Sequence, residues 1–367
     1  MHQKSAHLRQ VVLLGSALAA LACGGSREPT TGTGGAGTPP PAERVPLRKV
    51  AESRGLHIGV GAAVGSLFGR TDAAATQYTA LLAKEFNVIT PENDMKFQPL
   101  RPSRGEFRFA RADSMVEFAA ANGMKVRGHT LVWHSQLAPW LTSGNWTAAE
   151  AKALLDEHVS TVAGHYKGKL AAWDVVNEAL ADDGSPRSTF WSTHVGPDYI
   201  AQAFTTAHAA DPDVALFYND YGIEWPGAKQ DAAYALLADV RSRGVPVHGV
   251  GFQMHLALGQ APSKQSLLQT FERFAALGLK IEVTELDVRV QLPSTAQSLQ
   301  AQAQIYRDVY DACLQTPACD MVVTWGFTDL LSWVPSTFPN WGDALLFDAS
   351  FQPKPAYWSV HDLLEGK

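Results

Sequence analysis

The sequence predicts an α/β protein whose folded part is a single (β/α)8 TIM barrel. After Pro46, short runs rich in β-branched and aromatic residues alternate with longer alanine-rich amphipathic stretches, which is typical of βα units around a parallel sheet. Eight such runs follow one another, and no repeat or second linker divides them. Polar residues gather directly after most of the runs, where barrel enzymes carry their chemistry. A barrel preceded by a leader and a linker is therefore expected.

The first 22 residues resemble a signal peptide. Lys4 and Arg9 precede an apolar run over residues 11–22, which is too short to span a bilayer and suits a signal h-region. Residues 20–22 offer an A-x-A cleavage site, whereas Cys23, followed by two glycines, resembles a bacterial lipoprotein box. We predict export, either as a cell-envelope lipoprotein tethered to the membrane through Cys23 or as a secreted protein.

Residues 23–45 form a linker rich in Gly, Thr and Pro. Such a segment has too little apolar surface to order itself and serves as a flexible spacer. The folded domain is then expected over residues 46–367. With 46% hydrophobic and 18% charged residues and a formal net charge of -6, the composition is that of a globular protein. The composition lacks the basic excess of nucleic-acid-binding proteins, so we expect no nucleic-acid partner. We also expect the protein to be a monomer.

The strands and helices can be placed along the domain in order. Several helical patterns end at a glycine suited to a C-cap, such as Gly123 and Gly244. The expected strands lie near residues 57–63, 86–91, 125–132, 171–176, 214–219, 247–253, 280–285 and 321–327. The helical patterns between them include residues 72–84, 111–122, 148–166, 228–243 and 263–277.

Two glutamates at strand ends are the leading candidates for catalysis. Glu178 follows the fourth strand and Glu285 ends the seventh, so both would face one mouth of the barrel. Cleavage of a glycosidic bond uses such a pair, one as acid and one to meet the developing positive charge. If the carboxyl groups lie about 5 to 5.5 Å apart, the second attacks directly and configuration is retained.

Three further residues would support this pair. Asn177 precedes Glu178 and can donate to a sugar hydroxyl. His255 ends the sixth predicted strand and can reach Glu285, with Asp287 fixing its tautomer and keeping the glutamate ionised. A buried amide and a structural histidine are the alternative interpretations.

Two cysteines near the C-terminus predict a local disulfide. Cys313 and Cys319 flank a Thr-Pro turn, and an exported protein meets an oxidising compartment in which such a pair forms a bridge. The segment provides too few ligands for a metal site. We expect neither a metal nor a cofactor.

Seven motifs, in order, resemble glycoside hydrolase family 10, the endo-β-1,4-xylanases. The likeness covers about residues 55–360. The motifs are PENDMKF, GHTLVWHSQ, WDVVNEA, FYNDYG, GVGFQMHL, VTELD and WGFTDLLSW.

This resemblance implies a barrel with an open groove that binds xylan or xylo-oligosaccharides and cleaves internal bonds by double displacement. Glu178 matches the acid/base residue and Glu285 the nucleophile, held by His255 and Asp287. The residues that match sugar-binding positions are Glu92, Asn93 and Lys96 on the non-reducing side, His129, Trp133, Asn177 and Gln253 around the attacked sugar, Trp325 and Trp333 as walls, and Tyr221 on the leaving-group side.

The sequence departs from the family pattern away from the acid pair. Phe97 stands where Trp is frequent, Gly222 where Asn is common and Trp225 where a small residue is usual. We expect Trp225 to add a stacking surface for the leaving chain. Three alternatives stay open: a retaining barrel glycosidase acting on β-1,4-glucan or mannan, a metal-dependent barrel hydrolase using histidines such as His134, and a carbohydrate-binding protein without activity.

Overall fold

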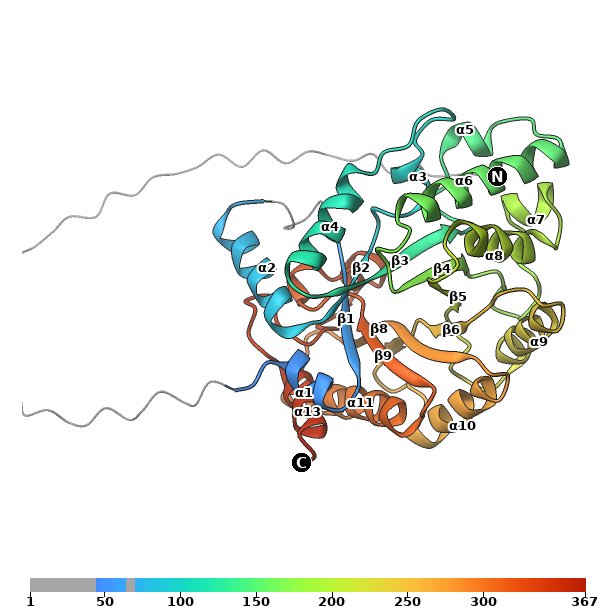
Figure 1. Cartoon of the computed structure of the whole chain (residues 1–367). Helices are drawn as coiled ribbons and strands as arrows, with labels where there is room; N and C mark the ends of the chain where they lie inside the picture. The colour runs from blue at the N-terminus through green and yellow to red at the C-terminus, as the bar shows by residue number, and fades with distance from the viewer. Residues whose placement is uncertain (1–43, 64–69) are drawn as a thin grey trace, which may run out of the picture. The chain divides into compact units, whose positions relative to one another are not determined.

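Eight parallel strands close into a barrel, with helices around the outside (Figure 1). The computed structural model describes residues 44–63 and 70–367, of which Val45–Lys367 belong to one compact unit. The predicted signal peptide and Cys23 lie outside the described residues. Among the described residues no helix has the length and apolar character needed to cross a bilayer.

The barrel strands occur in the predicted order. The first and last close the ring through parallel pairing of His57 with Met321. The strands are β1 (His57–Ala62), β2 (Val88–Pro91), β3 (Lys125–Val132), β4 (Ala172–Asn177), β5 (Ala215–Asp220), β6 (Gly249–Phe252), β8 (Lys280–Gln291) and β9 (Cys319–Thr324). The predicted eightfold barrel is confirmed.

The helices pack one apolar face onto the barrel. In α6, Thr147 caps the first turn and Glu150 reciprocates in a capping box, which satisfies backbone donors at the helix start. The longer helices are α1 (Leu47–Ser53), α2 (Ala73–Glu85), α4 (Ala110–Ala121), α6 (Ala148–His165), α8 (Tyr199–Ala210), α9 (Ala228–Ser242), α10 (Lys264–Ala275), α11 (Ala296–Gln315) and α13 (Pro355–Leu364). The shorter ones are α3 (Phe97–Leu100), α5 (Pro139–Thr142), α7 (Phe190–His194) and α12 (Val334–Thr337), with a 3-10 turn at Asp329–Leu331.

The barrel interior contains a buried ion network beneath the mouth. Arg127 on β3 pairs with Asp174 on β4 and, at 2.7 Å, with Glu282 on β8. The same Asp174 lies 2.9 Å from Nδ1 of His129. Removing one partner would leave a buried charge uncompensated, at a cost of about 3–5 kcal/mol. This network fixes the position of His129 at the base of the pocket described below.

The sixth and seventh strand regions differ from the prediction in a way that matters for the site. Strand β6 stops at Phe252, and after Met254, whose φ is 58°, the chain resumes as the short strand β7 (His255–Ala257). His255 therefore begins β7 instead of ending the sixth strand, because a left-handed residue interrupts the ladder. Strand β8 continues to Gln291, and its extension pairs with β7 and, antiparallel, with β10 (Trp341–Gly342).

The predicted disulfide is confirmed. It joins Cys313 near the end of α11 to Cys319 at the start of β9, with the two Cα atoms 5.2 Å apart. The turn between them is short, so the bridge fixes where α11 enters the last barrel strand.

Candidate active site

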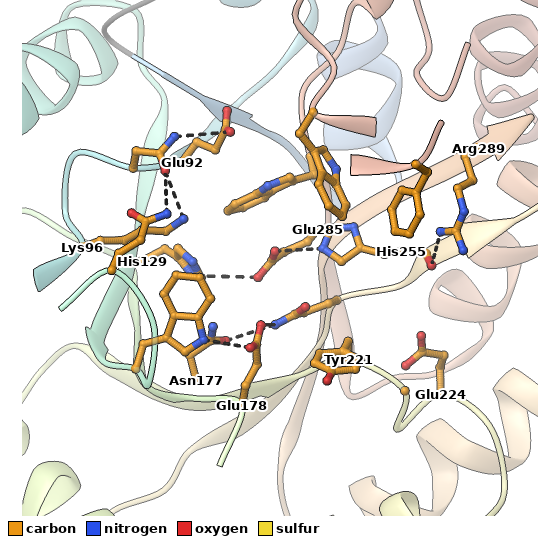
Figure 2. A pocket seen from close by; sticks show the side chains of 18 of the residues that line it. Glu92, Lys96, His129, Asn177, Glu178, Tyr221, Glu224, His255, Glu285 and Arg289 are labelled. Atoms are coloured by element: carbon orange, nitrogen blue, oxygen red, sulfur yellow. Dashed lines mark hydrogen bonds and ion pairs between the residues drawn. The ribbon is translucent and has the colours of Figure 1, made fainter. Parts of the chain in front are cut away.

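A pocket of about 560 Å³ opens at the carboxyl ends of the strands (Figure 2). Every residue predicted for the site lines it except Asp287, which is fully buried behind His255. The other predicted residues in the lining are Glu92, Asn93, Lys96, His129, Trp133, Asn177, Glu178, Tyr221, Gln253, His255, Glu285, Trp325 and Trp333.

Glu285 projects from β8 with both carboxylate oxygens held. Oε1 accepts a hydrogen bond of 2.8 Å from Nδ2 of Asn219, and Oε2 lies 3.2 Å from Nε2 of His255. Burial alone would raise the Glu285 pKa, but the fields of His129 and His255 and these hydrogen bonds outweigh it and lower the pKa to about 2. Glu285 is thus an ionised, oriented carboxylate at ordinary pH.

His255 is the cation that holds this carboxylate. Its Nδ1 lies 2.8 Å from Oδ2 of Asp287, and Nε1 of Trp333 donates to the same oxygen, also at 2.8 Å. Burial would lower the His255 pKa, but the two carboxylates prevail and raise it to about 10. The His255 imidazolium therefore lies between the carboxylates of Asp287 and Glu285. Trp333 is held in place by its hydrogen bond to the same Asp287 oxygen.

Glu178 meets different surroundings. Its backbone takes a left-handed φ of 56° directly after β4 ends. Oε2 accepts a bond of 2.8 Å from Nε1 of Trp133, and Oε1 accepts one of 3.0 Å from Nε2 of Gln253. His134 lies 3.7 Å away, and burial lowers its pKa and favours the neutral ring. Glu178 thus faces neutral donors where Glu285 faces a cation, and such a difference separates acid from base roles in a carboxyl pair.

One end of the pocket carries a chain of charged and polar groups. Nζ of Lys96 donates to Oδ1 of Asn93 at 3.2 Å, and Nδ2 of Asn93 donates to Oε1 of Glu92 at 3.4 Å. Burial raises the pKa of Glu92 and lowers that of Lys96. Alternating donors and acceptors of this kind suit a ligand rich in hydroxyl groups.

The opposite end is built around Tyr221, on the loop after β5. Nζ of Lys229 lies over its ring, 3.3 Å from the centroid, and Nη2 of Arg187 donates to its hydroxyl at 3.0 Å. Trp225 and the buried Glu224 also line this pocket. Figure 2 places Tyr221 and Glu224 away from Glu92 and Lys96, across the two central glutamates.

Three tryptophans form apolar walls. Trp133 and Trp325 flank His129, and Trp333 lies edge-on to His255 with ring centroids 4.9 Å apart. Gly61 on β1 permits this packing, since a Cβ there would lie 2.8 Å from the Trp325 ring. The pocket therefore combines flat rings with polar ends, as ring-shaped polar ligands require.

Sequence reasoning missed several residues of the site. Asn219 connects Glu285 with the segment that carries Glu178, because its Nδ2 contacts both Glu285 and the Asn177 amide. Its place at the end of the fifth strand, inside FYNDYG, was a usable signal. The other additional lining residues are Gln136, Glu224, Arg289 and Phe338. Gln136 is the last residue of the motif GHTLVWHSQ, whereas the other three lie outside the quoted motifs.

The pocket contains no evident metal centre within the described residues. Among the described residues, one group of side chains brings three potential metal-ligand atoms within 4.8 Å of one another. It comprises His361, Asp362 and Glu365, on and after α13. None of these lines the pocket.

The chain resembles known proteins over nearly its whole folded length. The model of glycosyl hydrolase family 10 matches residues 46–363. Endo-1,4-beta-xylanase B of Thermotoga neapolitana is 43% identical over 324 residues, covering 88% of this chain and 92% of that protein. Endo-1,4-beta-xylanase 1 of Humicola insolens is 43% identical over 291 residues, covering 78% and 68%.

Solved structures give the same result. Native xylanase 10B from Thermotoga maritima superposes with a TM-score of 0.85 at 43% identity, covering 88% of this chain and 98% of that one. Xylanase 10B from Thermotoga petrophila RKU-1, in complex with xylobiose, gives 0.86 at 42% identity, covering 89% and 99%.

Proposed function

The chain belongs to glycosyl hydrolase family 10, and on this premise we propose how its residues perform the reaction. It is an endo-1,4-β-xylanase that hydrolyses internal β-1,4 bonds of xylan with retention of configuration. The observation that carries the assignment of roles is the unequal setting of two carboxyl groups in one pocket: His255 holds Glu285, whereas neutral donors hold Glu178.

Glu285 is the nucleophile and Glu178 the acid/base. The Glu285 carboxylate attacks the anomeric carbon while the bond to the leaving oxygen breaks and Glu178 gives that oxygen its proton. Water then attacks the same carbon, the ionised Glu178 takes the water proton, and the ester to Glu285 breaks. The low pKa of Glu285 supports the first role.

The two ends of the pocket bind the xylan backbone on the two sides of the cleaved bond. Glu92, Asn93 and Lys96 bind sugar on the non-reducing side, and Tyr221 contacts the leaving-group side. His129, Asn177 and Gln253 surround the sugar under attack. This division is supported by the positions of the labelled residues on either side of the glutamates (Figure 2).

Trp333 favours xylose over glucose. Its indole cannot turn away without losing the hydrogen bond to Asp287, so a sugar that carries a hydroxymethyl group would be crowded where xylose is not. Hydrolysis of xylan compared with carboxymethylcellulose tests this preference against a glucan-specific glycosidase.

Azide rescue tests the two roles. With an activated aryl xylobioside, Glu178→Ala should give the β-azide, because Glu285 still forms the ester and azide replaces water. Glu285→Ala should be inactive alone, and azide should yield only the inverted α-azide. Glu92→Ala is the matched control, since it removes a carboxyl of the same pocket and should form no azide product. A β-azide from Glu285→Ala would contradict the assignment.

Trp225 stacks against the leaving chain. It lines the pocket beside Tyr221 and is half-buried, which leaves ring surface available. Trp225→Ala should weaken cleavage of long xylo-oligomers more than short ones, and equal effects would argue against stacking.

We propose that the protein is exported, either as a cell-envelope lipoprotein acylated at Cys23 or as a freely secreted enzyme. This proposal is supported by the leader pattern and the linker alone. Labelling cells with a lipid precursor distinguishes a lipoprotein from a freely secreted enzyme, because only the former retains label that Cys23→Ala removes.

A further inference from the structure

The C-terminal helix carries a group of potential metal ligands that the reaction does not use. Helix α13 lies beside α1, which begins the folded unit (Figure 1). One ligand atom each of His361, Asp362 and Glu365 lies within 4.8 Å of the other two. His361 and Glu365 are four positions apart, so they face the same side of the chain. None of the three lines the xylan pocket.

The imidazole of His361 is oriented as in a metal-ligating histidine. Its Nε2 lies 2.9 Å from the carbonyl oxygen of Val45, and because that oxygen can only accept, Nε2 carries the proton. In the neutral ring, Nδ1 then presents a lone pair. A histidine that ligates a metal is held in this way, since its other ring nitrogen donates to a backbone carbonyl or a carboxylate.

The Nδ1 atom of His361 is buried and lacks a hydrogen bond. The side chain is fully buried, and Nδ1 has no hydrogen-bond partner among the described residues. Oε2 of Glu365 lies 3.7 Å away, which is too far for a hydrogen bond. An unsatisfied buried nitrogen is costly, and a lone pair facing a carboxylate repels it unless a cation or a proton lies between them. This nitrogen is therefore directed at a place suited to a cation.

The end of α13 also concentrates negative charge. A helix C-terminus has a partial negative charge and is stabilised by cations, yet Asp362 lies in the last turn and Glu365 at the C-cap. Lys367 pairs with Glu365, and Arg54 donates to the carbonyl oxygen of Leu364 at 3.4 Å. Both of these basic side chains are exposed, and exposed contacts of this kind contribute little. A divalent cation held among the ligands would compensate the charge more effectively.

We propose that His361, Asp362 and Glu365 bind a Zn²⁺ ion that fastens the C-terminal helix to the start of the domain. One imidazole nitrogen with two carboxylates suits Zn²⁺, whereas Ca²⁺ takes oxygen ligands. Ligand atoms of a tetrahedral zinc site lie about 3.4 Å apart, so these three must approach by at most about 1.4 Å. The carboxylates can rotate to do so, because Asp362 is half-buried and Glu365 exposed. The ion is structural, and it revises the expectation of a metal-free protein.

Calorimetric titration of the purified, untagged protein, freed of metal with EDTA, tests the site. Zn²⁺ should bind at this site with one ion per chain. At a concentration a hundredfold above its Kd it should raise the Tm by about 4 °C. The same concentration of Ca²⁺ should leave the Tm unchanged. Asp362→Asn and Glu365→Gln should each weaken Zn²⁺ binding at least about tenfold, since even an outer partner of a metal ligand is worth that much.

The matched control is Asp113→Asn. Nε2 of His165 lies 2.8 Å from this carboxylate, in an imidazole–carboxylate pair that no third ligand joins within the described part of the chain. The control should bind Zn²⁺ as the wild type does. Lys367→Met removes the ammonium that competes for Glu365 and should tighten binding about two- to fivefold, the worth of an exposed ion pair.

The competing interpretation is a charged His361 ring that pairs with Glu365 without any metal. It predicts no Zn²⁺-dependent rise in the Tm, and that result would overturn the proposal with the wild type alone, even if a variant failed to fold. Zn²⁺ binding that survives both carboxylate substitutions would place the ion elsewhere and would overturn the proposal as well. Weaker binding by Lys367→Met would contradict the placement of the ion at the Glu365 carboxylate.

Discussion

Replacing His255 with Asn should move the acid limb of the pH profile upwards. The imidazolium lies 3.2 Å from Oε2 of Glu285 and helps to hold the Glu285 pKa at about 2. Asparagine can keep a hydrogen bond to the carboxylate but removes the charge. Because Glu285 must be ionised to attack, activity is lost as the pH falls through its pKa. A raised pKa therefore begins the loss at a higher pH.

The size of the shift follows from the geometry. An opposite charge within 4–6 Å lowers a carboxyl pKa by roughly 1 to 3 units, so the Glu285 pKa should rise from about 2 to roughly 3–5. Each unit corresponds to about 1.4 kcal/mol of lost preference for the carboxylate. Without the His255 charge, the effect of burial, which raises the Glu285 pKa, is opposed by fewer interactions. The His255 pKa of about 10 means that the wild-type histidine stays charged throughout the acid limb.

The assay is kcat/KM for an aryl xylobioside between pH 2.5 and 7, with preincubation at each pH followed by assay at neutral pH to exclude unfolding. His134→Asn is the matched control, since it removes an imidazole of the same pocket that lies beside Glu178. Its acid limb should coincide with that of the wild type. If His255→Asn also coincides, the charge of His255 does not set the ionisation of Glu285, and the reasoning fails.

Three other outcomes are expected. Trp333→Ala should raise kcat/KM for aryl cellobioside relative to aryl xylobioside about tenfold, the worth of one crowded group, and an unchanged ratio would exclude crowding as the source of the preference. Replacing Cys313 and Cys319 with Ala should lower the free energy of unfolding by about 2 kcal/mol for so short a loop; urea denaturation measures it, and added reductant should then have no further effect. Burial raises the Glu224 pKa from an ordinary 4.5 to about 7, so the folded state retains a proton that the unfolded chain releases, and wild-type stability falls between these pH values. Glu224→Gln should therefore gain stability relative to the wild type as pH rises from 5 to 8, by up to about 3 kcal/mol, whereas a constant difference would show that Glu224 does not titrate there.

Much of the site could be predicted because a barrel converts sequence order into proximity. Glu178 follows the fourth barrel strand, and Glu285 lies within the seventh, β8. The carboxyl ends of all eight strands meet at one mouth. The alternation of strand and helix patterns and the positions of the polar motifs are local properties of the sequence. The Cys313–Cys319 bridge was equally accessible, because only six positions separate the two residues.

Other features depend on contacts between distant residues. The charge of His255 depends on two carboxylates 30 and 32 positions away, and the interior ion network unites Arg127 with a glutamate 155 positions away. The hydrophobic periodicity of the sequence does not indicate which distant residues come into contact, or how deeply a titratable group is buried.

The sequence by itself determined the barrel, the two glutamates and the family pattern, because hydrophobic periodicity and motif order are written along the chain. Tertiary structure alone decided the left-handed turn at Glu178, the break at Met254, the extension of β8 and hence the place of Arg289 beside Phe338. Those features arise where strands, loops and charges from distant segments pack together, and their energies depend on separations through space.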